Sequence, residues 1–260
     1  LYILLILLSV VCMFPFLLMI VNATRSGSEI MKSFTLIPSV YLKENWATVF
    51  KYFNLFLGMW NSLKVAVPST LLCAYFSAMT AYALAMYKFK GNKVLFMTIL
   101  IFMMIPGQLG LIGFYNLCTK LHLVNSYIPL IIPAIASPGT VFFLRQYVLS
   151  VMPPSLIEAA RIDGAGPLTV LLKVYLPISL PALATVGLFA IVNHWNDYFS
   201  GLIYMSKASM YPLQTYIQQL TVDLTQITDA DQLKQLSALN NRSFNAAKIV
   251  VSTVPLLIIY

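Results

Sequence analysis

The chain has 260 residues, of which 60% are hydrophobic and only 9% are charged, and its formal net charge is +8. Soluble domains contain about 25% charged residues, so this composition excludes an ordinary soluble domain and predicts a protein embedded in a bilayer. The positive charge is consistent with an anionic membrane surface and equally with an acidic solute.

Six apolar segments are interpreted as membrane-spanning helices, each of which needs about 20 apolar residues. In chain order they are Tyr2–Val21, Asn61–Met86, Val94–Leu117, Tyr127–Leu149, Pro177–Tyr204 and Ala246–Tyr260. The last is shorter than a full span, so we expect the sequence to be trimmed there, as at its start. Backbone amides in lipid must all be hydrogen-bonded, and the period-2 pattern of a β-barrel is absent from these segments, which predicts an all-α membrane fold. We expect residues 1–260 to form a single membrane domain.

The charges of the short loops predict which side of the membrane each loop occupies. Lys88, Lys90 and Lys93 lie between the second and third spans without an intervening acid, which is typical of a cytoplasmic loop. With six spans, the loop at about 150–176 falls on the same side. The longer segments at about 22–60 and 205–245 then lie outside.

The loop at 150–176 has the sequence signals of two short helices joined by a turn. Ser155 is expected to be an N-cap, and Glu158 three residues later completes a capping box for a helix over 156–162. Asp163-Gly164 supplies a turn in which only glycine readily takes a positive φ. Pro167 suits the first turn of a second helix.

The same loop carries a family resemblance. Its run EAARIDGAG (158–166), followed by Leu176-Pro177, resembles the EAA loop by which permeases of binding-protein-dependent ABC importers engage their ATPases. The stretches 61–66, 142–146 and 195–198 are similar to carbohydrate-importer permeases of the maltose-transporter type. The resemblance is to the second of the two permease subunits in such a transporter. Within that family the chain looks closest to the branch for oligosaccharides and polysaccharide fragments.

The resemblance implies a six-helix type I ABC importer permease with a cytoplasmic helix-turn-helix coupling loop. The residues that would engage the ATPase are Glu158, Ala159, Ala160, Arg161, Asp163 and Gly164. Glu158 also has a purely local interpretation, as a residue that only caps its own helix. The implied partners are a second homologous permease, two cytoplasmic ATPase subunits, an extracytoplasmic solute-binding protein, membrane lipid and an oligosaccharide that is neutral or acidic, with no nucleic acid.

The implied location is the bacterial cytoplasmic membrane, crossed several times. A G-x-x-x-x-G-K-[ST] phosphate loop is absent from the sequence, so ATP and Mg²⁺ are expected on the separate ATPase. No cofactor or metal site is expected in this chain, which we interpret as a transport subunit and not an enzyme.

A polar interruption in the fifth apolar segment is the candidate solute path. An ionisable residue at membrane depth costs about 2.5–3.5 kcal/mol and normally faces a bundle interior or a water-filled cavity. The candidate path residues are Asn193, Trp195, Asn196, Asp197 and Tyr198, with Gln108 at the Pro106-Gly107 break of the third segment. A structural polar cluster between helices explains them equally well, and His194 is assigned no special chemistry.

Two other functions remain as alternatives. In an ion-gradient-driven transporter or a channel, Asp197 would be the coupling carboxylate. An intramembrane enzyme would need a nucleophile or metal-binding spacing, and the sequence offers neither at diagnostic positions. Cys12, Cys73 and Cys118 are far apart and are interpreted as packing residues.

Overall fold

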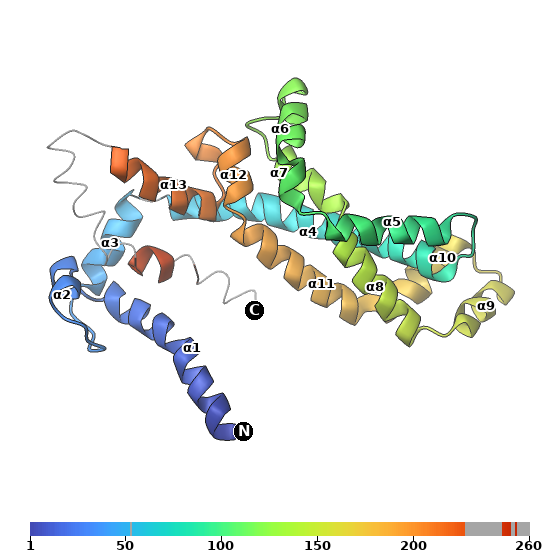
Figure 1. The fold of residues 1–260 in the computed structure, drawn as a ribbon, viewed down its shortest axis with the longest axis horizontal. Coiled ribbons are helices and arrows are strands. Elements are labelled where there is room, and N and C mark those ends of the chain that lie inside the picture. The colour runs from blue at the N-terminus through green and yellow to red at the C-terminus, as the bar shows by residue number, and fades with distance from the viewer. Residues whose placement is uncertain (53, 227–245, 251–252, 254–260) are drawn as a thin grey trace. The chain divides into compact units, whose positions relative to one another are not determined.

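The computed structural model describes the chain apart from residues 53, 227–245, 251–252 and 254–260. Every element in the described part is helical (Figure 1). The elements are α1 (Tyr2–Ala23), α2 (Gly27–Lys32), α3 (Leu42–Tyr52), α4 (Leu55–Met86), α5 (Asn92–Met104), η1 (Gly107–Gly110), α6 (Leu111–Lys120), α7 (Ile128–Ile131), η2 (Ile132–Ile135), α8 (Pro138–Val151), α9 (Pro154–Ile162), α10 (Pro167–Val170), η3 (Leu171–Tyr175), α11 (Leu176–Asn196), α12 (Phe199–Tyr204), η4 (Ala208–Met210) and α13 (Leu213–Gln226). Residues 1–60 with 213–260 form one compact unit, and residues 61–212 form a second.

Four stretches are long and apolar enough to cross a membrane, and a bent pair of helices provides a fifth candidate. The four are Tyr2–Ala23, Leu55–Met86, Ile128–Val151 and Pro167–Asn196. They confirm the expected first, second and fourth spans and most of the fifth. The expected sixth span, Ala246–Tyr260, lies largely outside the described residues. The described chain is therefore an all-helical membrane protein with four or five candidate spans.

The first unit contains α1, whose most apolar stretch has a mean hydropathy of 3.0 and no buried residue. Such a helix is suited to contact with lipid or with another subunit. After α1 the chain turns into α2 through a capping box. The backbone N–H of Glu29 donates to Ser26 Oγ at 3.3 Å, and the backbone N–H of Ser26 donates to Glu29 Oε2 at 3.2 Å.

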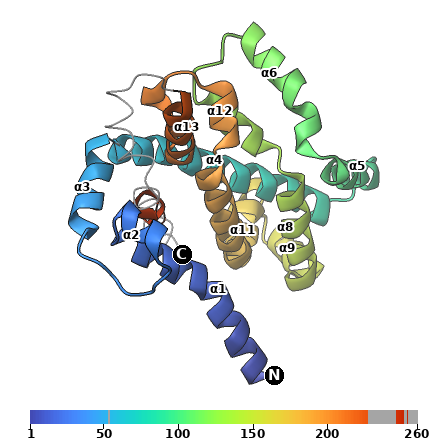
Figure 2. The ribbon, with the colours of Figure 1, turned by 60° about the vertical axis from the view of Figure 1, so that its left-hand side comes forward.

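The expected third span, Val94–Leu117, is not one helix, which corrects the sequence prediction. Helices α5 and α6 are bent by 92° relative to each other, with η1 between them (Figure 2). Ile105 is extended at φ −84° and ψ 121°, the conformation that a following proline favours, and Pro106 itself has no N–H to continue the ladder. The Pro106-Gly107 break therefore divides the expected span into two helices.

The expected fifth span, Pro177–Tyr204, is also corrected at both ends. At its start α11 continues without interruption from α10 through the π turn η3. At its end α11 stops at Asn196, because Asp197 leaves the helical conformation at ψ 96° and its Oδ1 accepts the N–H of Ser200 at 3.0 Å. Asp197 thereby caps the separate helix α12.

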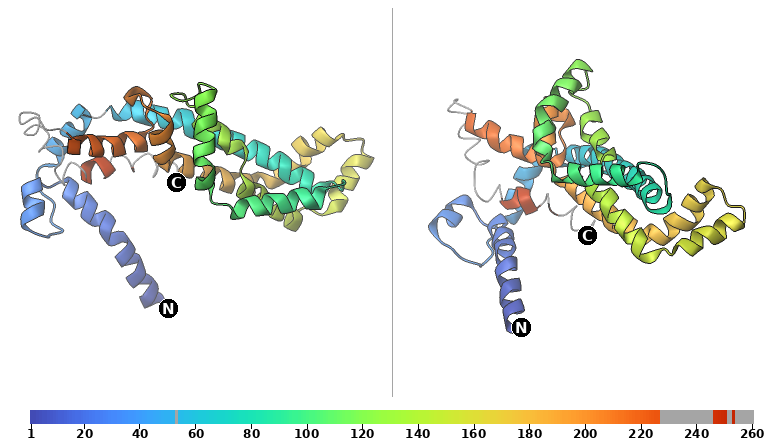
Figure 3. Two further views of the ribbon diagram at one scale, coloured as in Figure 1. Left: turned by 45° about the horizontal axis from the view of Figure 1, so that its top comes forward. Right: turned by 45° about the vertical axis from the view of Figure 1, so that its right-hand side comes forward.

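The core of the second unit lies between α4, α8, the α10–η3 segment and α11. Its largest buried side chains include Leu144, Val148 and Tyr175, and α4 contributes the small residues Ala78 and Ala81. Small residues let helix backbones approach closely, which is how membrane helices gain packing energy without a hydrophobic driving force. At the far end of this core, α9 and α10 project as a helical loop, seen in yellow in Figure 3.

A polar cluster that the sequence did not reveal holds the opposite end of the second unit. Asn61, which is 1% exposed, donates through Nδ2 to the carbonyls of Ser209 at 2.9 Å and Tyr211 at 3.2 Å. Asn125 has a positive φ of 62°, and its Oδ1 accepts the N–H of Ser206. The bonds of Asn61 fasten the loop at Ser209 and Tyr211 to α4, and the bond of Asn125 joins two loops to each other.

Candidate functional site: a helical loop and a polar cavity

The first helix of the loop begins two residues earlier than the sequence indicated. Helix α9 starts at Pro154, which takes the first helical position favoured by proline. Ser155 is therefore inside the helix, and the prediction that it caps the helix is wrong. The capping box of Ser155 with Glu158 is wrong for the same reason. The end of α9 at Ile162 and the start of α10 at Pro167 are confirmed.

Gly164 forms the turn between the two helices, as its sequence context predicted. Its φ is +80°, a left-handed conformation, and the N–H of Ala165 donates to the carbonyl of Ala160 at 2.9 Å. This is the bond of a Schellman motif, which satisfies a carbonyl at the C-terminus of α9. A Cβ on Gly164 would meet nothing within 4 Å, so only the backbone conformation demands glycine here.

Two faces of α9 have different surroundings. Ile157 is 4% exposed and, with Ala160 three residues later, packs on the core of the second unit. Glu158 and Ala159 lie on the surface, as does Asp163 in the turn. Arg161 is helical, and its side chain lies outside the described residues. Of the predicted coupling residues, Glu158 and Ala159 thus belong to the outward face of α9, and Ala160 to its inner side.

Two large apolar side chains are exposed on the same loop, and the sequence analysis did not select them. Ile162 is 86% exposed at the end of α9, and Leu168 is 65% exposed in α10. Helix α9 lies outside the candidate membrane spans, and Leu168 is the second residue of the span Pro167–Asn196. The exposure of Ile162 is therefore typical of a surface that another protein covers. Both residues were visible in the sequence as apolar residues in a polar loop.

Tyr82 of α4 attaches the loop to the membrane portion of the second unit. Its hydroxyl group donates to the carbonyl of Pro167 at 3.4 Å and lies 3.1 Å from the hydroxyl group of Tyr87. The ring of Tyr82 packs against that of Tyr175 in η3, with centroids 4.8 Å apart. Tyr82 thus connects α4 both to the start of α10 and to η3, which continues into α11.

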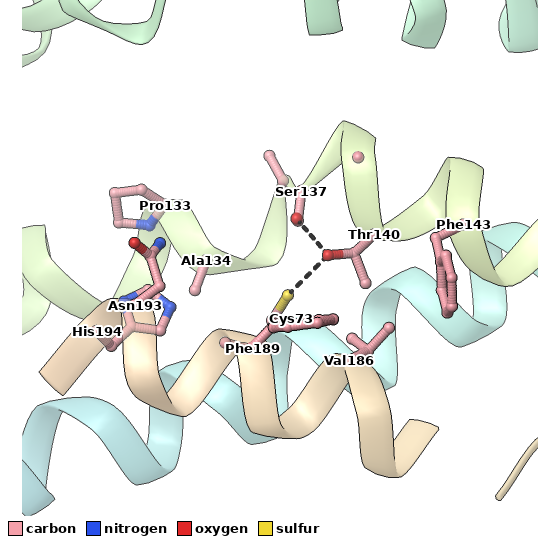
Figure 4. Close-up of a pocket in the computed structure, with 13 residues that line it drawn as sticks. Cys73, Pro133, Ala134, Ser137, Thr140, Phe143, Val186, Phe189, Asn193 and His194 are labelled. Carbon is pink, nitrogen blue, oxygen red and sulfur yellow. Dashed lines mark hydrogen bonds between the residues drawn. The ribbon is translucent and has the colours of Figure 1, made fainter. Parts of the chain in front are cut away.

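A cavity of about 560 Å³ lies between α4, the η2–α8 break and α11 (Figure 4). Its polar groups come from five residues: Cys73, Ser137, Thr140, Asn193 and His194. Aromatic and aliphatic walls are supplied by Phe143, Phe189, Val186 and Pro133. A pocket of hydrogen-bonding groups between apolar walls suits a ligand with hydroxyl groups and C–H faces.

Hydrogen bonds order the polar side of this cavity. Ser137 and Thr140 are joined through their hydroxyl oxygens at 2.7 Å, and the Cys73 thiol donates to Thr140 Oγ1 at 3.7 Å. Figure 4 shows Asn193 and His194 from α11 below Pro133, at one end of the cavity. The hydroxyl-bearing residues were detectable from the Ser137-Pro138 break in an apolar segment, a signal that the sequence analysis did not use.

The predicted path residues are not gathered in one place. Asn193 lines the cavity, whereas Trp195 is 1% exposed in the helix packing, and its Nε1 has no hydrogen-bond acceptor among the described residues. Asp197 caps α12, and Tyr198 is 45% exposed beside Phe199. Asn196 and Gln108 are exposed at the ends of their segments. His194, which was assigned no chemistry, does line the cavity.

Comparisons with known proteins agree on one family. The model of the binding-protein-dependent transport system inner membrane component matches residues 72–260, well over half of the chain. The arabinooligosaccharides transport system permease protein AraQ of Halalkalibacterium halodurans is 36% identical over 207 residues, which cover 78% of this chain and 74% of that protein. The polygalacturonan/rhamnogalacturonan transport system permease protein YtcP of Bacillus subtilis is 28% identical over 254 residues, covering 97% and 88%.

The fold agrees with the sequence comparisons. A chain from the crystal structure of a bacterial ABC transporter involved in the import of the acidic polysaccharide alginate matches with a TM-score of 0.85 and 25% identity, covering 100% of this chain and 92% of that chain. The chain therefore belongs to the binding-protein-dependent transport system inner membrane components, the ABC permeases that work with a binding protein and an ATPase.

Proposed function

We propose that this permease carries an oligosaccharide across the cytoplasmic membrane by alternating access. In this proposal residues 1–260 form one membrane domain with six spans, paired with a second homologous permease. Two ATPase subunits bind the cytoplasmic face, supplying ATP and Mg²⁺, and a solute-binding protein delivers the saccharide outside. Support for the substrate class comes from the relatives, whose names specify arabinooligosaccharides and polygalacturonan or rhamnogalacturonan.

The observation that carries the proposal is the construction of the α9–α10 loop. One face of the loop is fixed to the core through Ile157 and Tyr82, and the other exposes Glu158, Ile162 and Leu168. A closing pair of ATPases that grips the exposed face would move the loop as a rigid body. Because α10 continues through η3 into α11, that motion would reach the helix that lines the cavity.

The cavity supports a saccharide as the transported solute. Hydroxyl and amide groups from Ser137, Thr140 and Asn193 suit sugar hydroxyl groups, and Phe143 and Phe189 suit the C–H faces of sugar rings. The lining contains neither lysine nor arginine. The cavity therefore favours uncharged sugar units, and the carboxylates of an acidic fragment would have to meet cations elsewhere, including on the second permease.

Reconstitution with each energy source in turn tests the proposal. The complex purified with this chain is placed in vesicles with a labelled arabino- or galacturono-oligosaccharide and its binding protein, with ATP inside and no ion gradient. We expect uptake that stops when ATP is replaced by a non-hydrolysable analogue. Uptake driven by a proton or sodium gradient without ATP would overturn the importer mechanism and favour a secondary transporter.

A further inference from the structure

A second hollow, of about 400 Å³, lies where α4 ends and α5 begins. Lys88 and Lys93 supply its cations, and Leu84, Phe89 and Val94 supply its apolar surface. The transport mechanism proposed above does not use this hollow. We therefore consider which ligand its lining would bind.

The turn that shapes this hollow is held in place by Asn92. Its side-chain Nδ2 donates to two carbonyls at the C-terminus of α4, that of Leu84 at 3.2 Å and that of Tyr87 at 2.8 Å. Gly91 beside it has a φ of +93°, which allows the chain to reverse tightly. Specific hydrogen bonds therefore define the turn that borders the hollow.

The electrostatics of the hollow favour an anion. Lys88, Lys90 and Lys93 are all exposed, and within the described part of the chain they form no ion pair. Helix α5 adds its positive end, because its first turn has no acidic residue and Gly91 provides no side-chain cap. Three lysines within the six residues 88–93 give this turn a local positive charge that favours an anion.

The position of the hollow restricts the kind of anion. It lies between two candidate membrane helices, at the end of the second unit that carries the α9–α10 loop, because Tyr87 contacts Tyr82 and Tyr82 contacts Pro167. Exposed apolar side chains adjoin the cations, with Phe89 at 43% and Val94 at 69% exposure. A ligand for this place needs a negative headgroup and an apolar tail.

We propose that this hollow binds the headgroup of an anionic phospholipid, with its phosphate between Lys88 and Lys93 and its acyl chains along Val94. Its assignment to the cytoplasmic leaflet rests on the proposed function, in which the α9–α10 loop faces the cytoplasm. A lipid held there would set the position of the α4–α5 turn against the membrane. The ligand class follows from the combination of cations and apolar surface at a membrane boundary.

Lipid retention, measured by native mass spectrometry, tests the site. The complex that contains this chain is purified from its native membrane, delipidated and supplied with phosphatidylglycerol or phosphatidylcholine. We expect phosphatidylglycerol to be retained in preference. Retention should weaken about five-fold in Lys88→Gln or Lys93→Gln, and about twenty-five-fold in the double variant.

Lys120→Gln is the matched control, because Lys120 is an exposed lysine at the end of α6 and does not line the hollow. It should leave retention unchanged. Equal retention of the two lipids, or full retention by the double variant, would overturn the proposal. Displacement of phosphatidylglycerol by millimolar inorganic phosphate would instead assign the hollow to free phosphate. The assay uses neither ATP nor saccharide, so its result is independent of the transport mechanism.

Discussion

The rings of Tyr82 and Tyr175 pack with their centroids 4.8 Å apart and a tilt of 56°, joining α4 to the π turn η3. The hydroxyl group of Tyr82 reaches the carbonyl of Pro167, where α10 begins. A single side chain of α4 therefore contacts both ends of the segment that links the α9–α10 loop to α11. This contact therefore joins α4 to the π-helical segment through which α10 continues into α11, the helix that lines the cavity.

Replacing Tyr82 by alanine should separate the loop from α4. The side chain is 5% exposed, and removing a buried aromatic ring costs about 3–5 kcal/mol, so we expect a clearly lower thermal unfolding temperature and reduced uptake per ATP hydrolysed. Tyr82→Phe keeps the ring and should lose only about 1 kcal/mol. Tyr75→Ala is the control, since Tyr75 is 55% exposed on the same helix; an equal loss in that variant would argue against this contact.

Gly164→Val should uncouple ATP hydrolysis from uptake. A β-branched residue resists the left-handed φ of +80°, and even an unbranched residue pays about 1–2 kcal/mol there. We expect the turn to open, so that the complex hydrolyses ATP with little uptake. The measurement is the ratio of saccharide imported to ATP hydrolysed in vesicles.

Gly166→Val provides the control for added bulk in the same loop. Gly166 has a φ of −70°, which valine adopts readily, and a Cβ there also meets nothing within 4 Å. Near-normal coupling in this variant, beside a loss in Gly164→Val, would identify backbone geometry as the cause. Equal loss in both variants would contradict that explanation.

Ile162→Ser should weaken ATPase binding without harming the fold. Ile162 is 86% exposed, so the change removes little internal packing, whereas a covered interface would lose an apolar contact worth about 1.5–3 kcal/mol. We expect normal thermal unfolding of the permease and loss of ATPase during affinity purification. Ile157→Ser, at 4% exposure, should instead destabilise the permease itself. Full ATPase retention in Ile162→Ser would remove this residue from the interface.

The sequence predicted the features that depend on the conformational limits of one or two neighbouring residues. The turn at Gly164 and the start of α10 at Pro167 follow from the conformational limits of those residues. The break at Pro106-Gly107 was recognised without its 92° bend, and the end of α11 at Asn196 was missed, because an apolar run looks alike whether it is straight or bent. Hydropathy indicates whether a segment lies in lipid or in water. The path of the backbone depends also on packing and helix capping, which hydropathy does not describe.

The cavity was predicted only in part for a related reason. Asn193 was recognised because a polar side chain in an apolar segment stands out. Ser137, Thr140 and Cys73 are small and only weakly polar, and their grouping depends on how α8 and α4 meet. Trp195 and Asn193 are two positions apart on α11, so they point in different directions, and adjacency in the sequence did not mean a shared site.

Asn193→Leu should reduce saccharide uptake while leaving the ATPase interface intact. The substitution removes a hydrogen-bonding amide from the cavity lining at similar volume, and a site left without such a group typically binds about 1–3 kcal/mol more weakly. We expect a higher concentration for half-maximal uptake and normal co-purification of the ATPase. Asn196→Leu changes the same residue type at an exposed position outside the lining and should leave uptake nearly unchanged. The reverse ranking would place the path along Asn196.

Asp197→Asn distinguishes an ATP-driven importer from a gradient-driven transporter. In the structure Oδ1 of Asp197 accepts the N–H of Ser200 and caps α12, a role that asparagine fulfils equally well. We therefore expect uptake close to that of the unaltered chain. Asp197→Ala should lose about 1 kcal/mol of stability through the missing cap, without a change in energy source. Two results together would refute the importer mechanism and make this carboxylate an ion-coupling group. The first is abolition of uptake in Asp197→Asn, and the second is loss of uptake in the unaltered chain when the ion gradient is collapsed at constant ATP.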